Sequence, residues 1–121
     1  MSGVRAIRGA TQLEANSASA MEAATKELLL EMLTANDLTP EEIISVFLTV
    51  TPDLNAAFPA AYAREVGFAA VPLLCAVEID VPGALPRVLR VMAHCNTVRK
   101  ASEINHIYLH GAKALRRDIA Q

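Results

Sequence analysis

Apolar side chains recur with two different periods along the chain, and the two periods separate strands from helices. Residues 3–11 are short, rich in β-favouring side chains and bounded by turn residues, which predicts a first strand. Residues 17–35 repeat apolar side chains every three or four positions, which predicts a long amphipathic helix. We expect Ser19 and Glu22 to form a capping box at its start, and Asn36 to end it.

The rest of the chain predicts two shorter helical segments and four more strands. Thr39, a proline and Glu42 give the start signal of a short helix. A turn and another short helix should occupy residues 51–68, where proline and glycine punctuate an alanine-rich stretch. The remaining strands are expected at 45–51, 71–81, 87–97 and 106–109, followed by a basic helical turn at 113–117.

This order of elements predicts an α/β sandwich: a five-stranded mixed sheet with one long helix on one face and additional short helices. A length of 121 residues suits a single domain, 1–121. One helix leaves the second face of an apolar sheet uncovered, and that patch is too large for a monomer. We therefore expect assembly through sheet faces or edges into a closed ring or a dimer.

Composition and charge exclude several classes of protein. Apolar residues make up 53% of the chain and charged residues 20%, which is enough to build a core and argues against disorder. No apolar run reaches the ~18 residues of a membrane span. A formal net charge of −2 argues against a nucleic-acid partner, which would favour a basic stripe.

The cysteine and histidine positions indicate neither a disulfide framework nor a metal site. Cys75 and Cys95 do not form a CxxC pair, and no set of cysteines and histidines has metal-ligand spacing. The first ten residues contain no long hydrophobic segment, so we expect no signal peptide. These features favour a reducing, cytoplasmic setting without a bound metal.

Residues 74–91 raise a question of chemistry, because they hold charges within an otherwise apolar stretch. Glu78, Asp80, Arg87 and Arg90 flank a turn that contains prolines and a glycine. Such a layout fits plain surface chemistry, and it equally fits the rim of a site for a small polar molecule. The pattern by itself leaves both interpretations open.

A short set of further residues completes the candidates for a site. Period two places Arg8 on the same strand face as Val4 and Ala10, where it either pairs with an anion or reaches solvent. The chain shows no Ser-His-Asp order and no phosphate-binding loop. The other candidates are Arg64, Tyr108 and Cys75, whereas the three histidines are more typical of structural positions.

Six features in order along the chain resemble the monofunctional, AroH-class chorismate mutases. They are IRGAT (7–11), TPDLNAAFPA (51–60), VPLLC (71–75), Glu78, RVLRVM (87–92) and HIYL (106–109). The likeness spans nearly the whole chain with family-like spacing. It implies a homotrimer that forms a pseudo-α/β barrel, with three active sites in the clefts between subunits.

The resemblance also implies a reaction, the rearrangement of chorismate to prephenate in phenylalanine and tyrosine biosynthesis on the shikimate pathway. The step is pericyclic, so the family needs no nucleophile, general base, metal or cofactor. In the family's pattern Arg90 is the cation beside the ether oxygen, and Glu78 holds the ring hydroxyl. Arg8 and Tyr108 resemble the groups that hold carboxylate.

The remaining site residues are also implied by the resemblance. The family's pocket would be lined by Leu74, Cys75, Ala76 and Val77, by Phe58 and Arg64 of the adjacent subunit, and closed by Leu115 and Arg116. Strict alternation puts Cys75 and Glu78 on opposite faces of a strand. If both line one pocket, the strand must end or bulge between them.

The sequence departs from the family pattern mainly near its C-terminal part, in residues 110–121, which we expect to form a flexible tail. Asn105 stands where family members often have arginine, Arg117 replaces a usual proline, and Ala61 stands where relatives carry a charge. These positions bear on closure of the site and on affinity. They leave Arg8, Glu78, Arg90 and Tyr108 untouched.

Two other functions stay open beside the mutase. Trimeric imine deaminases of the Rid/YjgF type have a related architecture and bind a carboxylate with arginine. A non-catalytic trimer that binds small carboxylates would also show a polar cleft. The pairing of Glu78 with Arg90 across a turn, together with residues 106–109, fits the mutase pattern better.

Overall fold

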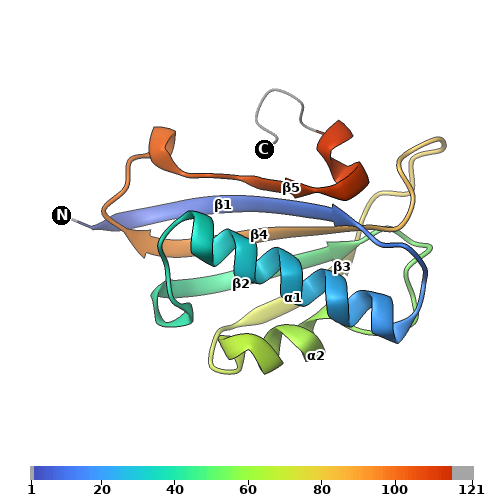
Figure 1. Ribbon diagram of the computed structural model, residues 1–121, viewed down its shortest axis with the longest axis horizontal. Coiled ribbons are helices and arrows are strands. Elements are labelled where there is room, and N and C mark those ends of the chain that lie inside the picture. Colours follow the sequence, from blue (N-terminus) through green and yellow to red (C-terminus); the bar gives the residue numbers. More distant parts are fainter. Residues whose placement is uncertain (1, 116–121) are drawn as a thin grey trace.

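The structure, a computed structural model, describes residues 2–115 and contains a five-stranded mixed sheet in the order β3-β2-β4-β1-β5 (Figure 1). The strands are β1 (Gly3–Gln12), β2 (Ile43–Val50), β3 (Leu73–Val77), β4 (Val88–Thr97) and β5 (Ile107–Leu109). The helices are α1 (Ala18–Ala35) and α2 (Pro59–Ala63), with short turns η1 (Pro40–Glu42), η2 (Arg64–Phe68), η3 (Ala101–Glu103) and η4 (His110–Ala114). The predicted α/β class is confirmed.

Strand β4 is the centre of the sheet and pairs antiparallel with β1 on one side and β2 on the other. The outer strands run parallel to their neighbours, β3 to β2 and β5 to β1. Because β3 and β5 are the two edges, the segments around them lie at opposite ends of the sheet.

The N-cap of helix α1 is Ser17, two residues before the Ser19 that the sequence indicated. Ser17, in an extended conformation, accepts a hydrogen bond from the backbone N–H of Ala20 at 3.1 Å, so it is the N-cap. The prediction of a Ser19–Glu22 capping box is wrong, because Ser19 already lies inside the first helical turn. Asn36 ends the helix as predicted.

The core lies between α1 and the sheet, and one glycine brings the two unusually close. Met21, Leu28 and Met32 on α1 are buried against the strands. A Cβ atom at Gly9 of β1 would lie 2.4 Å from the sulfur of Met32. The absence of a side chain at Gly9 therefore sets the distance at which α1 packs on β1.

Strand β3 is shorter than the predicted 71–81, since it spans Leu73–Val77 only. Its partner β2 ends at Val50, whose carbonyl accepts the N–H of Glu78 at 2.9 Å. Beyond that bond the chain turns away through the Pro82–Gly83 region, and Gly83 has a φ of +83°. Glu78 therefore lies just past the strand, at the start of the turn.

The boundaries of the other elements shift by smaller amounts. Residue Arg87 has a φ of +53°, so β4 begins at Val88. Turn η4 spans His110–Ala114, and residues 116 and 117 of the predicted helical turn 113–117 lie outside the described part of the chain. The start signal at Thr39 is confirmed, because its N–H donates to the Glu42 carboxylate at 2.9 Å.

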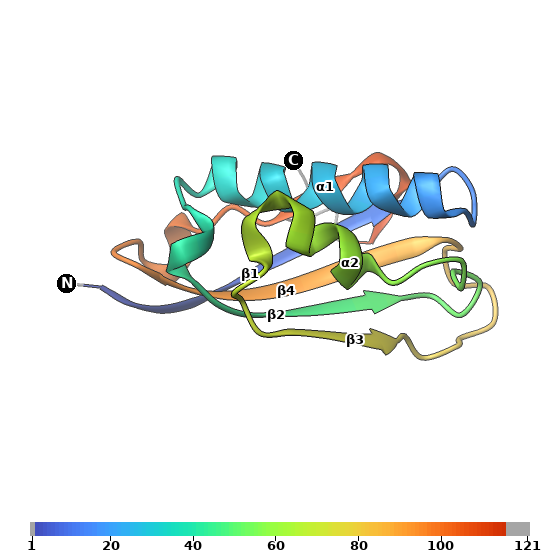
Figure 2. The same cartoon turned by 90° about the horizontal axis from the view of Figure 1, so that it is seen from below.

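Both α-helices lie on the same side of the sheet (Figure 2). Neither covers the opposite face, where, among residues 2–115, Ala112 of η4 packs only on Ala10 and Tyr108 near the β5 edge. Strand alternation directs Val4, Phe47 and Leu74 to this uncovered face, where their exposed fractions are 57%, 45% and 58%. The expected uncovered apolar face is present. No helix in the described range is long and apolar enough to cross a membrane.

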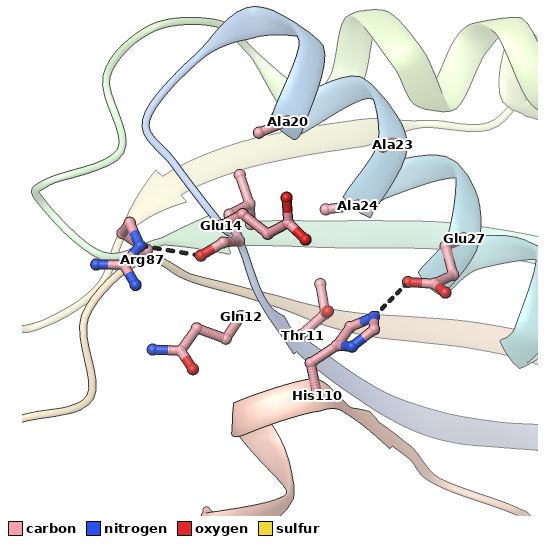
Figure 3. A pocket seen from close by; sticks show the side chains of 10 residues that line it. Thr11, Gln12, Glu14, Ala20, Ala23, Ala24, Glu27, Arg87 and His110 are labelled. Carbon is pink, nitrogen blue, oxygen red and sulfur yellow. Dashed lines mark hydrogen bonds and ion pairs between the residues drawn. The ribbon is translucent and has the colours of Figure 1, made fainter.

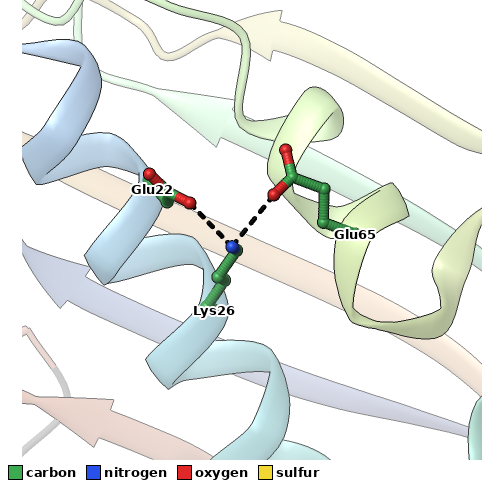
Figure 4. A network of polar contacts seen from close by, with 3 residues as sticks. All are labelled: Glu22, Lys26 and Glu65. Carbon is green, nitrogen blue, oxygen red and sulfur yellow. Dashed lines mark hydrogen bonds and ion pairs between the residues drawn. The ribbon is translucent and has the colours of Figure 1, made fainter.

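A three-residue ion network ties α1 to the segment that carries Arg64 (Figure 4). Lys26 on α1 binds Glu22 at 2.7 Å and Glu65 of η2 at 3.0 Å. The hydrogen bond that Lys26 donates to Glu22 is the main reason why the pKa of Lys26 is raised, and the bond to Glu65 adds to the effect. The network fixes the turn that follows α2 against the long helix.

Candidate active site

Four of the predicted site residues converge in one pocket on the uncovered face of the sheet. The pocket has a volume of 170 Å³, and its lining includes Arg8, Glu78, Arg90 and Tyr108, together with Thr49. We call it the arginine pocket. Strands β1, β2, β4 and β5 contribute to it, and Glu78 comes from the turn that follows β3.

The pairing register explains why these side chains meet. Ala10 of β1 lies opposite both Arg90 of β4 and Tyr108 of β5, and Thr49 of β2 also lies opposite Arg90. Arg8 is two positions from Ala10, so it shares the same face. The predicted face of Arg8 is thereby confirmed.

The electrostatics of the arginine pocket favour an anion. The Arg90 guanidinium lies 3.7 Å from the Glu78 carboxylate, and the Thr49 hydroxyl donates a hydrogen bond to the other carboxylate oxygen of Glu78. Arg8 adds a second guanidinium to the same lining. Two permanent cations against one carboxylate leave a net positive charge, which attracts a negatively charged ligand.

Arg8 makes a backbone hydrogen bond to a side chain in addition to the pairing of its strand. Its backbone N–H donates to Nδ1 of His106 at 2.9 Å, immediately before β5. This contact links β1 to the segment that leads to Tyr108. His106 therefore has a structural bond, as expected for the histidines of this chain.

The second group of predicted residues lies elsewhere, beside the β3 edge. Phe58, Cys75, Ala76 and Val77 line a separate surface pocket of 400 Å³, which we call the edge pocket. Cys75 packs against the core on the helix side, whereas Glu78 reaches the arginine pocket on the opposite side. Alternation holds along β3 without a bulge, so Cys75 and Glu78 do not share a pocket within one chain.

The other predicted residues are described only in part. Leu74 lies on the uncovered face of β3, and Arg64 is exposed at the end of α2. Leu115 is 37% exposed after η4, while Arg116 and Arg117 lie outside the described residues.

Asn105 has a structural role that accounts for one departure from the family pattern. Its side-chain amide donates to the Ala35 carbonyl at 2.8 Å, and its backbone N–H donates to Asn36 Oδ1 at 2.8 Å. Asn36 in turn donates to the Asn105 carbonyl at 2.9 Å. Asn105 therefore binds the C-terminal end of α1 rather than pointing at the arginine pocket.

Sequence reasoning missed five residues that line the arginine pocket, and three of them, Thr49, Phe47 and Met92, have side chains on the uncovered face. Period two along β2 and β4 could have placed all three on one face. What the sequence lacked was the pairing of β2 with β4, which puts Thr49 opposite Arg90. Thr49 matters most, since it binds the Glu78 carboxylate.

Comparison with known proteins defines the family. The family model for chorismate mutase type I matches residues 4–119. The chain is 50% identical over 117 residues to the chorismate mutase AroH of Thermus thermophilus, covering 96% of each chain. It is 38% identical over 118 residues to the chorismate mutase AroH of Bacillus subtilis, covering 97% of this chain and 93% of the relative.

A solved structure agrees with the sequence comparisons. The chorismate mutase from Clostridium thermocellum superposes with a TM-score of 0.89 at 49% identity, covering 91% of this chain and 98% of the other. The fold and the site thus define a small α/β isomerase with an arginine-rich pocket on a sheet face. The chain belongs to the chorismate mutase type I family, which confirms the predicted family and enzyme class.

Proposed function

We propose that the arginine pocket converts chorismate to prephenate, with Arg90, Glu78, Arg8 and Tyr108 as the residues that contact substrate. The observation that carries the proposal is the convergence of two guanidinium groups and one carboxylate on a sheet face. A net positive pocket suits a substrate with two carboxylates. The carboxylate in the pocket supplies a single acceptor for a hydroxyl group.

The rearrangement moves electrons within one molecule. The ether C–O bond breaks while a C–C bond forms, and no proton or group is transferred to the protein. Two tasks remain for the site: to hold the substrate in its compact shape, and to stabilise the negative charge that grows on the ether oxygen. Arg90 performs the second task, and Arg8 and Tyr108 hold carboxylate for the first.

Glu78 acts best if its carboxylate has one fixed orientation. Thr49 donates to one of its oxygens and Arg90 lies near the other, so the carboxylate is held from two sides. A fixed carboxylate accepts the substrate hydroxyl without first paying the entropy of ordering itself. We infer that Thr49 positions Glu78.

We further propose that the complete site needs a second copy of the chain, within a homotrimer. The arginine pocket has 170 Å³, which is below the ~300 Å³ at which ligand sites usually start. Phe58 is 75% exposed, and it lies with Cys75 at the far edge pocket. The apolar uncovered face offers the surface that a partner copy would bury.

In this arrangement Phe58 and Arg64 of one subunit complete the arginine pocket of the next, and Leu115 with Arg116 closes it. Arg64 would add a third cation to a site that binds a dianion. The three subunits together would form the pseudo-α/β barrel. We place the enzyme in the cytoplasm, where its two free cysteines would stay reduced.

The test is loss of chorismate absorbance with purified protein, without added metal or cofactor, and with prephenate identified as the product. Rapid loss that yields prephenate is the expected result. A folded protein that leaves chorismate at its uncatalysed rate would contradict the proposal. Turnover of imine substrates in that case would favour the deaminase alternative.

A further inference from the structure

A second pocket, larger than the arginine pocket, lies on the helix-bearing side of the sheet (Figure 3). It has a volume of 560 Å³, within the range of about 300–1,000 Å³ that is typical of small-molecule sites. The N-terminal half of α1, the end of β1 and turn η4 surround it. We call it the alanine pocket, after Ala20, Ala23 and Ala24, which α1 presents to it.

Charged side chains of both signs line the alanine pocket. Arg87 lies at one end, and the ion pair between His110 and Glu27, 2.9 Å long, lies at the other (Figure 3). Glu14 lies between them, beside the helix. Among residues 2–115, neither the Glu14 carboxylate nor the terminal nitrogens of Arg87 make a hydrogen bond or ion pair, so both can bind a ligand.

Arg87 is fixed in place although its guanidinium end is unpaired within the described chain. Its Nε donates to the Leu13 carbonyl at 2.9 Å, and its backbone N–H donates to Asp53 at 2.9 Å. These bonds hold Arg87 at a φ of +53°, a left-handed conformation that is unfavourable outside glycine. The strained backbone and these two bonds hold the Arg87 cation in place at the end of the pocket.

At the other end of the alanine pocket, His110 has the same left-handed backbone conformation as Arg87. Its φ is also +53°, and within residues 2–115 only Asp37 shares this conformation among the non-glycine residues. Two of the three such positions thus line one pocket, and strained residues are concentrated at functional sites. The ion pair with Glu27 closes this end and leaves Arg87 and Glu14 for recognition.

We propose that the alanine pocket binds a free α-amino acid with an apolar side chain. Glu14 and Glu27 would repel a simple anion, and Arg87 would repel a simple cation, so neither kind of ligand suits the whole lining. A zwitterion satisfies both signs, with its carboxylate on Arg87 and its ammonium group on Glu14. Its side chain then lies along the row of small alanines, which leave space and present only methyl groups.

The first experiment compares three probes on the full-length protein by calorimetry and by ligand-observed NMR. They are L-phenylalanine, 3-phenylpropionate, which lacks the ammonium group, and 2-phenylethylamine, which lacks the carboxylate. Saturable binding of phenylalanine is expected, at least about tenfold tighter than either half-ligand, because each loses one charged hydrogen bond. Absence of saturable phenylalanine binding, or equal binding of 3-phenylpropionate, overturns the proposal.

Two variants locate the binding. Ala23→Leu fills the pocket from an exposed helix position, and Glu14→Gln removes the ammonium partner without disturbing any bond among the described residues. Both should lose at least about tenfold in affinity. The matched controls Ala18→Leu and Glu31→Gln, exposed outside the pocket, should bind like the parent protein.

Melting temperature and chorismate turnover are measured on the same samples. Both variants should keep the parent melting temperature and turnover, since neither residue contributes to the core or to the arginine pocket. Unchanged phenylalanine affinity in Ala23→Leu overturns the site whatever the mutase assay gives. The test therefore stands apart from the proposed function.

Discussion

Arg90 lies on β4 between the neighbouring strands β1 and β2, and close to Glu78 at the turn after β3. Its side chain is 48% exposed, so water screens its attraction to Glu78 at 3.7 Å in the free chain. A bound substrate and a covering subunit would exclude that water, and the same charge would then act more strongly. We therefore expect Arg90 to contribute little to folding stability and, in the proposed reaction, much to stabilising the transition state.

Replacing Arg90 with glutamine is expected to lower turnover by about 100- to 1,000-fold, or roughly 3–4 kcal/mol of barrier. The change removes the cation that we propose faces the ether oxygen but keeps a long polar side chain. Steady-state kinetics on chorismate provide the measurement. Arg5→Gln, on the same sheet but outside the arginine pocket, is the matched control.

The electrostatic role of Arg90 would be wrong if turnover of Arg90→Gln stayed within a few-fold of the parent. The variant should also keep its melting temperature, because an exposed ion pair is worth only about 0–1 kcal/mol. A large loss of stability would indicate that Arg90 has a structural role instead.

At the scale of elements, the contact between α1 and β1 depends on a single missing side chain. Gly9→Ala would place a Cβ atom 2.4 Å from the Met32 sulfur, and Leu28 lies behind it at 3.2 Å. The helix or Met32 must move, and such overpacking typically costs about 1–3 kcal/mol. Urea unfolding of the variant measures the loss.

Gly3→Ala is the control on the same strand, because no atom lies within 4 Å of a Cβ built at Gly3. It should unfold at the same urea concentration as the parent or slightly higher. Equal stability of the two variants would show that Met32 adapts without cost. In that case Gly9 does not set the helix-to-sheet distance.

A second element-scale feature is the junction between the end of β2 and the start of β4, where Asp53 is the acceptor. The Thr51 hydroxyl donates to Asp53 at 2.5 Å and the Arg87 N–H donates at 2.9 Å. The Thr51 bond is the main reason why the pKa of Asp53 lies below its ordinary value of 3.8. Protonation of Asp53 therefore favours the unfolded chain.

Asp53→Asn should consequently lower stability at neutral pH and lose this effect in acid. A depressed pKa stabilises the folded state above pH 3.8, and the contribution disappears as pH falls through the folded pKa. Urea unfolding of parent and variant at pH 7 and in steps down to about pH 3 tests this. A difference that stays constant over the whole range would contradict it.

The elements were predictable where local chemistry decides them. Apolar periodicity predicts the long helix and the strand face of Arg8, and a capping residue predicts the helix end at Asn36. Both signals depend only on a few neighbouring residues. The length of β3 was not predictable, because it depends on where β2 ends rather than on its own apolar run. Ser17 was missed as the cap, since its extended backbone is a property of the preceding loop.

The arginine pocket was predictable only in part, and for a related reason. The residue pattern gave Arg8, Glu78, Arg90 and Tyr108 as candidates and the resemblance gave them roles, and the strand order brings them together. Thr49 could not be found without knowing that β2 pairs with β4. The separation of Cys75 from Glu78 follows simply from alternation along β3.

At the scale of the whole molecule, one chain carries the residues of the proposed site in two separate pockets. The arginine pocket reaches β5, and the edge pocket with Phe58 lies beside β3. Within one chain, Cys75 of the edge pocket faces the helix side of the sheet and Glu78 of the arginine pocket faces the opposite side, so the two pockets stay apart. In a ring of copies, the β3 edge of one subunit can meet the β5 side of the next.

Hybrid oligomers test this arrangement. Arg8→Ala and Arg64→Ala homo-oligomers should each be nearly inactive, because every site lacks one cation. When the two are mixed and exchanged, some sites combine intact Arg8 with intact Arg64, so activity should partly recover. Mass spectrometry confirms the exchange, and exchanged hybrids that stay inactive would contradict the shared site.

The position of β1 inside the sheet has a consequence for how the protein is made. Both of its neighbours, β4 and β5, come later in the chain, and Gly3 pairs only with Thr97. At a translation rate of about 5–20 residues per second, a ribosome needs several seconds to make the intervening segment. During that time β1 has no partner strand, and its apolar face depends on α1, which follows β1 in the chain and packs against it.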